Sequence, residues 1–112
     1  MIQSYAFGAM VINGQEYTAD LIVFPEKIHP AWWRKEGHKL ALEDLGDVFK
    51  ENIEALVIGT GFFGLMKVEQ VVLDAARAKG LVLHIEKTEK AVQIFNRLIS
   101  QKKTAGAFHL TC

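Results

Sequence analysis

The chain has 112 residues, and its 13 lysines and arginines balance its 13 aspartates and glutamates, so the formal net charge is zero. Nucleic-acid-binding proteins usually carry a basic surplus, because contacts with phosphates supply much of their affinity. The composition therefore argues against nucleic acid as a partner. Half of the residues are hydrophobic, which is enough to bury one core in a single domain spanning residues 1–112.

The single cysteine, Cys112, limits the chemistry further. One thiol cannot form an internal disulfide, and the paired cysteines of common zinc sites are absent. No apolar run approaches the roughly 20 residues that a membrane span needs, and no basic leader segment opens the sequence. We therefore expect a cytoplasmic protein without a membrane partner.

The first predicted element is a β-hairpin. Residues 5–12 and 16–24 are rich in β-branched and aromatic side chains and flank Asn13-Gly14, a pair that favours a type I′ turn because both residues tolerate a positive φ. Pro25 and Pro30 then bracket a stretch that is unsuited to a helix or a central strand. A loop with two adjacent tryptophans continues to His38.

Residues 44–52 are predicted to form a short helix with Asp44 as its N-cap. An apolar strand follows at residues 55–58, and a turn at residues 59–64 (the glycine turn) is expected to lead at once into a second helix. Gly80 is placed to end that helix. Its predicted apolar stripe consists of Leu65, Val68, Val71, Val72, Ala75 and Ala76.

Residues 81–85 form the next predicted strand, Thr88 is expected to cap a third helix, and residues 106–110 form the last strand. Strands that alternate with helices through short connections pair in parallel, with right-handed crossovers. With the hairpin, this order predicts an α/β fold in which helices cover a mixed central sheet. The buried face of the third helix is expected to hold Val92, Phe95, Leu98 and Ile99.

The glycine turn has the pattern G-x-G-x-x-G, and Glu86 follows the next strand, as in a dinucleotide-binding fold. Three features weigh against a dinucleotide. The chain is too short for two lobes, the strand is not the first of the domain, and Phe62-Phe63 crowd the place of a pyrophosphate. Two interpretations stay open: a site for another small anion or ligand, or a structural turn that needs glycines for a tight connection.

If the turn binds a ligand, the topology predicts which residues line the site. In open α/β sheets, ligands gather at the carboxyl ends of the strands. Cys112 is also a candidate nucleophile there, but no base can be assigned to it, and a small packed residue is the simpler interpretation. The candidate ligand-binding residues are Gly59, Thr60, Gly61, Thr88 and Cys112.

A second candidate site is the loop that carries Trp32, Trp33, Arg34 and His38, with Asp20 expected nearby. Tryptophan and arginine are over-represented at interaction hot spots, so this loop is a candidate surface for a protein partner. Alternatively, the tryptophans cover an open edge of the sheet. We favour that covering role for one of them and leave the other open.

The histidines show no metal-ligand spacing, so we expect no metal site and no cofactor. Two of them alternate within strand patterns and are interpreted as partly buried structural residues. The four are His29, His38, His84 and His109, of which the latter two lie in the strands.

Several motifs, taken in order, resemble a known family. They are Asn13-Gly14 with Tyr17 and Asp20, Trp33-Arg34 with Gly37-His38, Asp44, Leu56-Val57-Ile58-Gly59-Thr60-Gly61, Thr88-Glu89 with Ala91-Val92 and Asn96, and His109-Leu110-Thr111-Cys112. Over nearly its whole length the chain resembles the adipogenesis-associated Mth-type domain family (Mth938-like domain), which includes a mitochondrial assembly factor for respiratory complex I. The resemblance implies a three-layer fold with a mixed central sheet, and it implies no catalytic residues.

Two functional hypotheses follow. The first is a non-enzymatic module for protein interaction or assembly, because the sequence shows no nucleophile-base pair and carries the tryptophan-containing loop. The assembly-factor resemblance also suggests protein partners. The second is a small-molecule or anion-binding protein, or a small enzyme, that uses the sheet edge at the glycine turn. We favour the first, and with it a protein that is not an enzyme.

Overall fold

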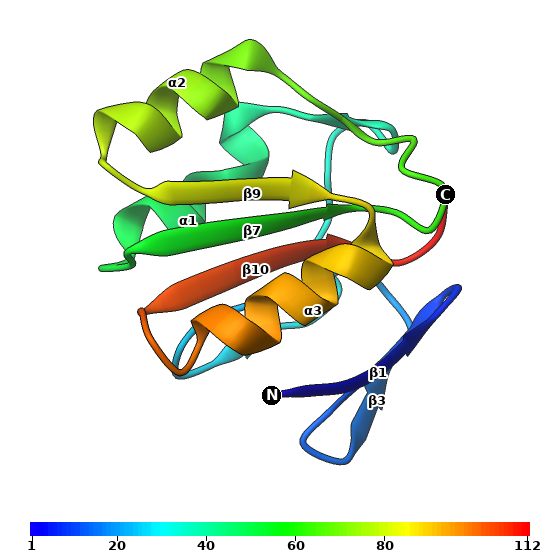
Figure 1. Ribbon diagram of the computed structural model, residues 1–112. Helices are drawn as coiled ribbons and strands as arrows, with labels where there is room; N and C mark the ends of the chain where they lie inside the picture. Colours follow the sequence, from blue (N-terminus) through cyan, green and yellow to red (C-terminus); the bar gives the residue numbers. More distant parts are fainter.

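A five-stranded mixed sheet forms the centre of the molecule in the computed structural model, which describes all residues 1–112 (Figure 1). Its strand order is β5-β4-β10-β7-β9. The last strand lies in the middle, parallel to β7 and antiparallel to β4. The five strands are β4 (Leu21–Val23), β5 (Ile28–His29), β7 (Ala55–Thr60), β9 (Val82–Glu86) and β10 (Thr104–His109).

The predicted N-terminal hairpin is confirmed at its turn, and its strands differ from the prediction. Asn13 and Gly14 have φ values of 50° and 82°, and they join β2 (Ala9–Ile12) to β3 (Gln15–Tyr17). The expected strand 5–12 is divided by a turn at Gly8, whose φ is 80°, and its first part is β1 (Ile2–Ala6). The expected strand 16–24 is also divided. Its first part, β3, pairs with β2 in a small three-stranded sheet of order β1-β2-β3, whereas β4 joins the central sheet.

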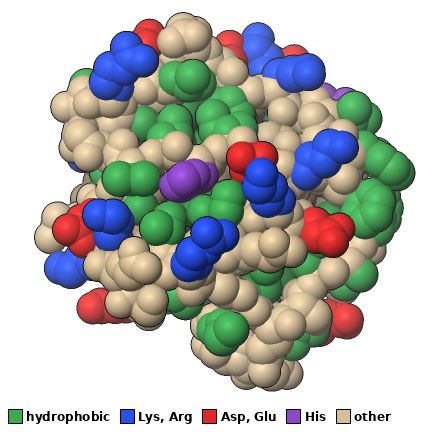
Figure 2. Space-filling view, in the orientation of Figure 1, with side chains coloured by type: hydrophobic (Ala, Val, Ile, Leu, Met, Phe, Trp, Pro, Cys, Tyr) green, Lys and Arg blue, Asp and Glu red, His purple; other side chains and the backbone are tan.

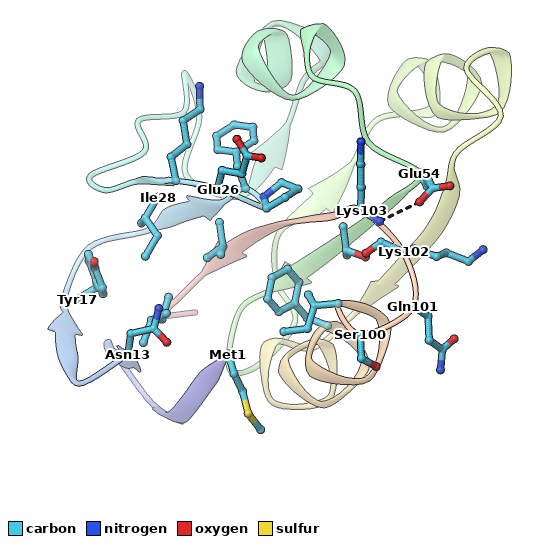
Figure 3. A pocket seen from close by; sticks show the side chains of 18 residues that line it. Met1, Asn13, Tyr17, Glu26, Ile28, Glu54, Ser100, Gln101, Lys102 and Lys103 are labelled. Carbon is cyan, nitrogen blue, oxygen red and sulfur yellow. Dashed lines mark hydrogen bonds between the residues drawn. The ribbon is translucent and has the colours of Figure 1, made fainter.

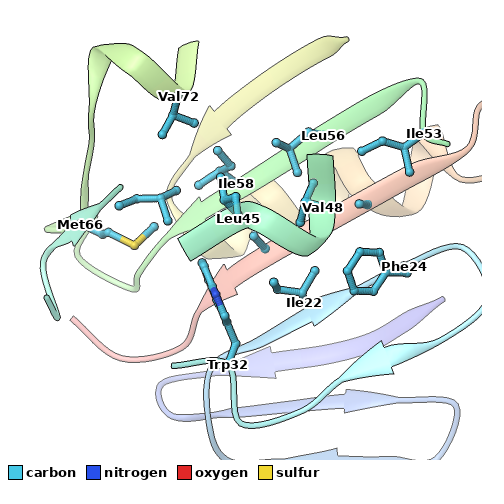
Figure 4. Close-up of a cluster of buried hydrophobic side chains, with 13 residues drawn as sticks. Ile22, Phe24, Trp32, Leu45, Val48, Ile53, Leu56, Ile58, Met66 and Val72 are labelled. Atoms are coloured by element: carbon cyan, nitrogen blue, oxygen red, sulfur yellow. The ribbon is translucent and has the colours of Figure 1, made fainter. Parts of the chain in front are cut away.

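Helices cover both faces of the central sheet. On one face, α1 (Gly46–Lys50) and α2 (Gln70–Ala78) enclose a core that includes Trp32 (Figure 4). On the other face, α3 (Thr88–Leu98) packs on the sheet beside the three-stranded sheet. The buried face of α3 holds Val92 and Phe95 as predicted. The α/β, three-layer fold with a mixed sheet is therefore confirmed.

The helix ends confirm one predicted capping residue and correct another. Gly80, at a φ of 70°, ends α2 as predicted, because its N–H and that of Leu81 donate to the last carbonyls of the helix. Asp44 is not an N-cap, which corrects the prediction. It lies inside a 3₁₀ helix (η1, Leu42–Leu45) that precedes α1, and its carboxylate accepts hydrogen bonds from the N–H groups of Ala41 and Lys35.

The glycine turn does not open a helix, which corrects a second prediction. The chain loops back through a hydrogen bond from the Met66 N–H to the Thr60 carbonyl. Residues Lys67–Val68 then pair as β8 with β6 (Lys39–Leu40), and α2 begins only at Gln70. Leu65 is therefore outside the helix and half exposed. No helix of the fold is long and apolar enough to span a membrane.

Candidate functional site

The fold brings the five predicted ligand-site residues together at the carboxyl end of β7 and β10. The Thr88 hydroxyl joins two of the segments, because it donates to the His109 carbonyl at 2.7 Å and accepts from the Gly61 N–H at 2.9 Å. The sequence had suggested that Thr88 caps α3. It is instead the first residue of that helix, so this prediction is corrected. Its side chain holds the glycine turn to β10.

This edge is filled by the chain itself. A Cβ atom on Gly61 would lie 2.5 Å from the carbonyl carbon of Cys112, and one on Gly59 would lie 2.8 Å from the Thr88 Oγ1. The glycines therefore permit close packing, of Gly61 on the Cys112 backbone and of Gly59 on the Thr88 side chain. A cavity of about 900 Å³ lies at the opposite end of the sheet instead, and Figure 3 shows Asn13 and Tyr17 on one side of it and Lys102 and Lys103 on the other.

A buried charged network stands next to the glycine turn. The Asp20 carboxylate accepts hydrogen bonds from Arg34 Nη1 at 2.6 Å, from His109 Nδ1 at 2.7 Å and from the Leu110 N–H at 2.8 Å. Arg34 also donates to the Gly37 carbonyl at 2.9 Å. The network therefore ties β10 and the segment after it to the tryptophan loop.

The proton positions in this network follow from the charges. Burial disfavours the ionised Asp20, but the hydrogen bonds from His109, Leu110 and Arg34 together lower its pKa. The ionised Asp20 carboxylate can only accept a hydrogen bond, so His109 Nδ1, at 2.7 Å from it, carries the proton and donates to Asp20. Arg34 Nη2, which lies 3.1 Å from the same nitrogen, donates to the Gly37 carbonyl instead. His109 Nε2 is buried without a hydrogen-bond partner, so no thiol or hydroxyl is placed to give it a proton. The network therefore has a structural role: it holds the tryptophan loop against β10 and the segment after it.

The structure separates the four residues of the predicted interaction loop. Trp32 is buried in the core on the α1 side of the sheet and donates from Nε1 to the Asp44 carbonyl, so it has a structural role. Arg34 is buried in the charged network, so it does not belong to a surface. Trp33, with 76% of its surface exposed, and His38 remain at the surface.

Sequence reasoning missed a cluster of exposed aromatic side chains. Phe62 and Phe63 of the glycine turn pack edge to face with 5.1 Å between ring centroids, and the Phe7 ring of the β1–β2 turn lies 5.8 Å from that of Phe62 and 6.2 Å from that of Phe63. Figure 2 shows hydrophobic side chains gathered at its right edge, where Figure 1 places the glycine turn and the C-terminus. We call Phe7, Phe62, Phe63 and Leu65, exposed by 39–58%, the aromatic patch.

The backbone beneath the aromatic patch is held by the segment after β10. The N–H groups of Gly8, Phe62 and Leu65 donate to the carbonyls of residues 110, 111 and 112 respectively. That segment is itself held by Asp20 through Leu110 and His109. The charged network therefore fixes the segment after β10, and that segment fixes the backbone that carries the exposed aromatic rings. The adjacent Phe62-Phe63 in a turn was the sequence signal that pointed here.

Tyr5, beside the patch, gives a test of this packing. Its hydroxyl donates to the Leu110 carbonyl at 2.8 Å, and burial, with a smaller contribution from nearby carboxylates, raises its pKa from 10.0 to about 12. The fold favours the neutral phenol, so this stabilisation is fully present below pH 10 and is lost as the pH rises towards 12. In urea unfolding across that interval, Tyr5→Phe should lose less stability than the wild type. A Tyr17→Phe variant, which retains Tyr5, should show the wild-type loss; equal losses in all three proteins would contradict the prediction.

Comparison with known proteins assigns the chain to a family. The family described as "Protein of unknown function (DUF498/DUF598)" matches residues 2–109. The chain is 28% identical over 109 residues to NADH dehydrogenase (ubiquinone) 1 alpha subcomplex assembly factor 3 of Xenopus tropicalis and to the human protein of that name. These alignments cover 95% of this chain and 58% of each relative, less than two thirds of its length.

A solved structure shares the whole architecture. The protein MT938 is 25% identical, with a TM-score of 0.82, and the match covers 100% of this chain and 98% of that one. This confirms the resemblance to the Mth938-like fold that the motifs predicted. The chain therefore belongs to the family of proteins of unknown function DUF498/DUF598.

Proposed function

We propose that this protein is a non-enzymatic interaction module that aids the assembly of another protein complex, and that the aromatic patch contacts its partner. The observation that carries the proposal is the patch itself: three phenylalanines and a leucine exposed on a backbone that hydrogen bonds hold in place. Aromatic side chains, phenylalanine included, are enriched in the cores of protein interfaces, and little entropy is lost when rings held on a fixed backbone are buried.

The curated relatives support a protein as the partner. Their name describes an assembly factor, and we extend that role to this chain as part of the proposal. The net charge of zero fits a protein partner better than nucleic acid. We propose that the chain acts as one domain over residues 1–112, and that it acts in the cytoplasm, where its single thiol stays reduced.

The test is quantitative affinity purification from the cells that produce the protein. The tagged wild type should recover a specific partner, and the double variant Phe7→Asp/Phe63→Asp should recover it at least about tenfold less, because charges replace the two most exposed rings of the patch. Both proteins should unfold at similar temperatures, since these side chains are already half exposed.

Two further variants make the result specific to the patch. Val71→Asp places a charge at a similarly exposed apolar position of α2 and should retain the partner. Trp33→Asp tests the other exposed aromatic residue. If Trp33→Asp loses the partner and the patch variant keeps it, the interaction surface is the tryptophan loop and our assignment of the patch is wrong.

A further inference from the structure

The two edges of the central sheet are protected very differently. β5 has two residues and lies between Pro25 and Pro30, which is how proteins commonly prevent another strand from pairing with an edge. β9 has five residues, Val82–Glu86, with no proline, no lysine and no strand on its outer side. Figure 1 shows it as the uppermost strand of the sheet, below α2. This long edge is left open.

The pairing register shows which backbone groups face outward from β9. The strand is parallel to β7, and the Val82 N–H donates to the Glu54 carbonyl at 3.0 Å. Because backbone groups alternate along a strand, His84 and Glu86 also face β7, whereas the N–H and C=O groups of Leu83 and Ile85 point away from it. An added strand would find these two residues ready to pair.

A shallow apolar cavity lies beside this edge. Its volume is about 370 Å³, it lies between α2 and β9, and four of its six lining residues are hydrophobic. Arg77 stands at the cavity, exposed, and forms no ion pair. The lining residues are Leu73, Ala76, Arg77, Gly80, Leu81 and Leu83.

We propose that β9 binds an extended peptide segment of a partner protein as a sixth strand of the sheet. The outward N–H and C=O groups of Leu83 and Ile85 pair with the peptide backbone. An apolar side chain of the peptide enters the cavity, and a carboxylate near it meets Arg77. An open strand edge next to a helix, with a pocket between them, is a recurrent geometry for recognition of extended peptides.

This site is separate from the aromatic patch. The cavity and Arg77 lie beside the start of β9, where Val82 pairs in register with Ala55, whereas the rings of Phe62 and Phe63 come after the last residue of β7, Thr60. The peptide site therefore makes the module bivalent, with a patch for a folded surface and an edge for an extended segment. Either site can fail its test without affecting the other.

The test starts from a displayed library of random decapeptides selected on the full chain. We expect the enriched sequences to alternate apolar and polar residues and to carry an acidic residue. On addition of the best synthetic peptide, hydrogen exchange measured by NMR should slow at least about tenfold at the amides of Leu83 and Ile85. N-methylation of the peptide at alternate amides should abolish binding, because it removes the donors of the added strand.

Charge reversal tests the contact with the carboxylate. Arg77→Glu should weaken peptide binding at least about tenfold, whereas Arg97→Glu, an exposed arginine on α3, should leave it unchanged. The proposal is overturned if no sequence is enriched, or if the peptide binds and leaves the Leu83 and Ile85 amides unprotected. It is also overturned if these amides become protected in the free chain as its concentration rises, since a second copy would then occupy the edge.

Discussion

Replacing Asp20 with alanine should lower the free energy of unfolding by about 3–5 kcal/mol, the usual result when one partner of a buried ion pair is removed. Three donors lose their acceptor at once: Arg34, His109 and the Leu110 N–H. The Arg34 guanidinium then stays buried with its charge uncompensated, since only 5% of its side chain is exposed. Urea unfolding followed by circular dichroism measures the loss.

Two comparisons show whether the buried network causes this loss. Asp74→Ala removes an exposed carboxylate that accepts a hydrogen bond from Gln70, and it should change stability by no more than about 0.5 kcal/mol. The double variant Asp20→Ala/Arg34→Met should be more stable than the sum of the single losses predicts, because it leaves no unpaired buried charge. A loss for Asp20→Ala as small as that for Asp74→Ala would contradict the role of the network.

The parts of the fold that sequence reasoning predicted correctly depend on neighbouring residues. Asn13-Gly14 turns the hairpin and Gly80 ends α2, because each needs only a left-handed backbone at its own position. The parallel strands and their helices follow from short connections and apolar patterns. These signals are local, so the fold class could be predicted even though strand lengths were not.

The charged network and the aromatic patch depend on residues far apart in the chain. Asp20 and His109 are 89 positions apart, and no spacing in the sequence indicates that they meet. The patch needs the turns at Phe7 and Phe62 to lie side by side, which follows only once the segment after β10 holds both. Thr88 shows the same effect, since its tertiary hydrogen bonds replace the helix cap that its position suggested.

The glycine turn links these two features, and Gly61 is where its structural role can be measured. Gly61 has a φ of 107°, and a Cβ there would lie 2.5 Å from the Cys112 backbone and 2.8 Å from the His109 ring. Gly61→Ala therefore combines a backbone conformation unfavourable for alanine with overpacking against a chain segment that cannot move freely. We expect a loss of about 2–4 kcal/mol in unfolding free energy.

Gly14→Ala is the matched control for Gly61→Ala, because its φ is 82° and nothing lies within 4 Å of its Cβ position. Gly14→Ala introduces the unfavourable backbone conformation without a steric clash, so it should lower the free energy of unfolding by only about 1–2 kcal/mol. The difference between the two losses in unfolding free energy is the cost of the steric clash with the segment after β10. The same Gly61→Ala protein should exchange its Phe62 amide faster, since the bond from that amide to the Thr111 carbonyl at 2.6 Å is strained or lost. Equal costs for both variants would mean that the glycine turn does not depend on this packing, and that the aromatic patch is held in place by other contacts.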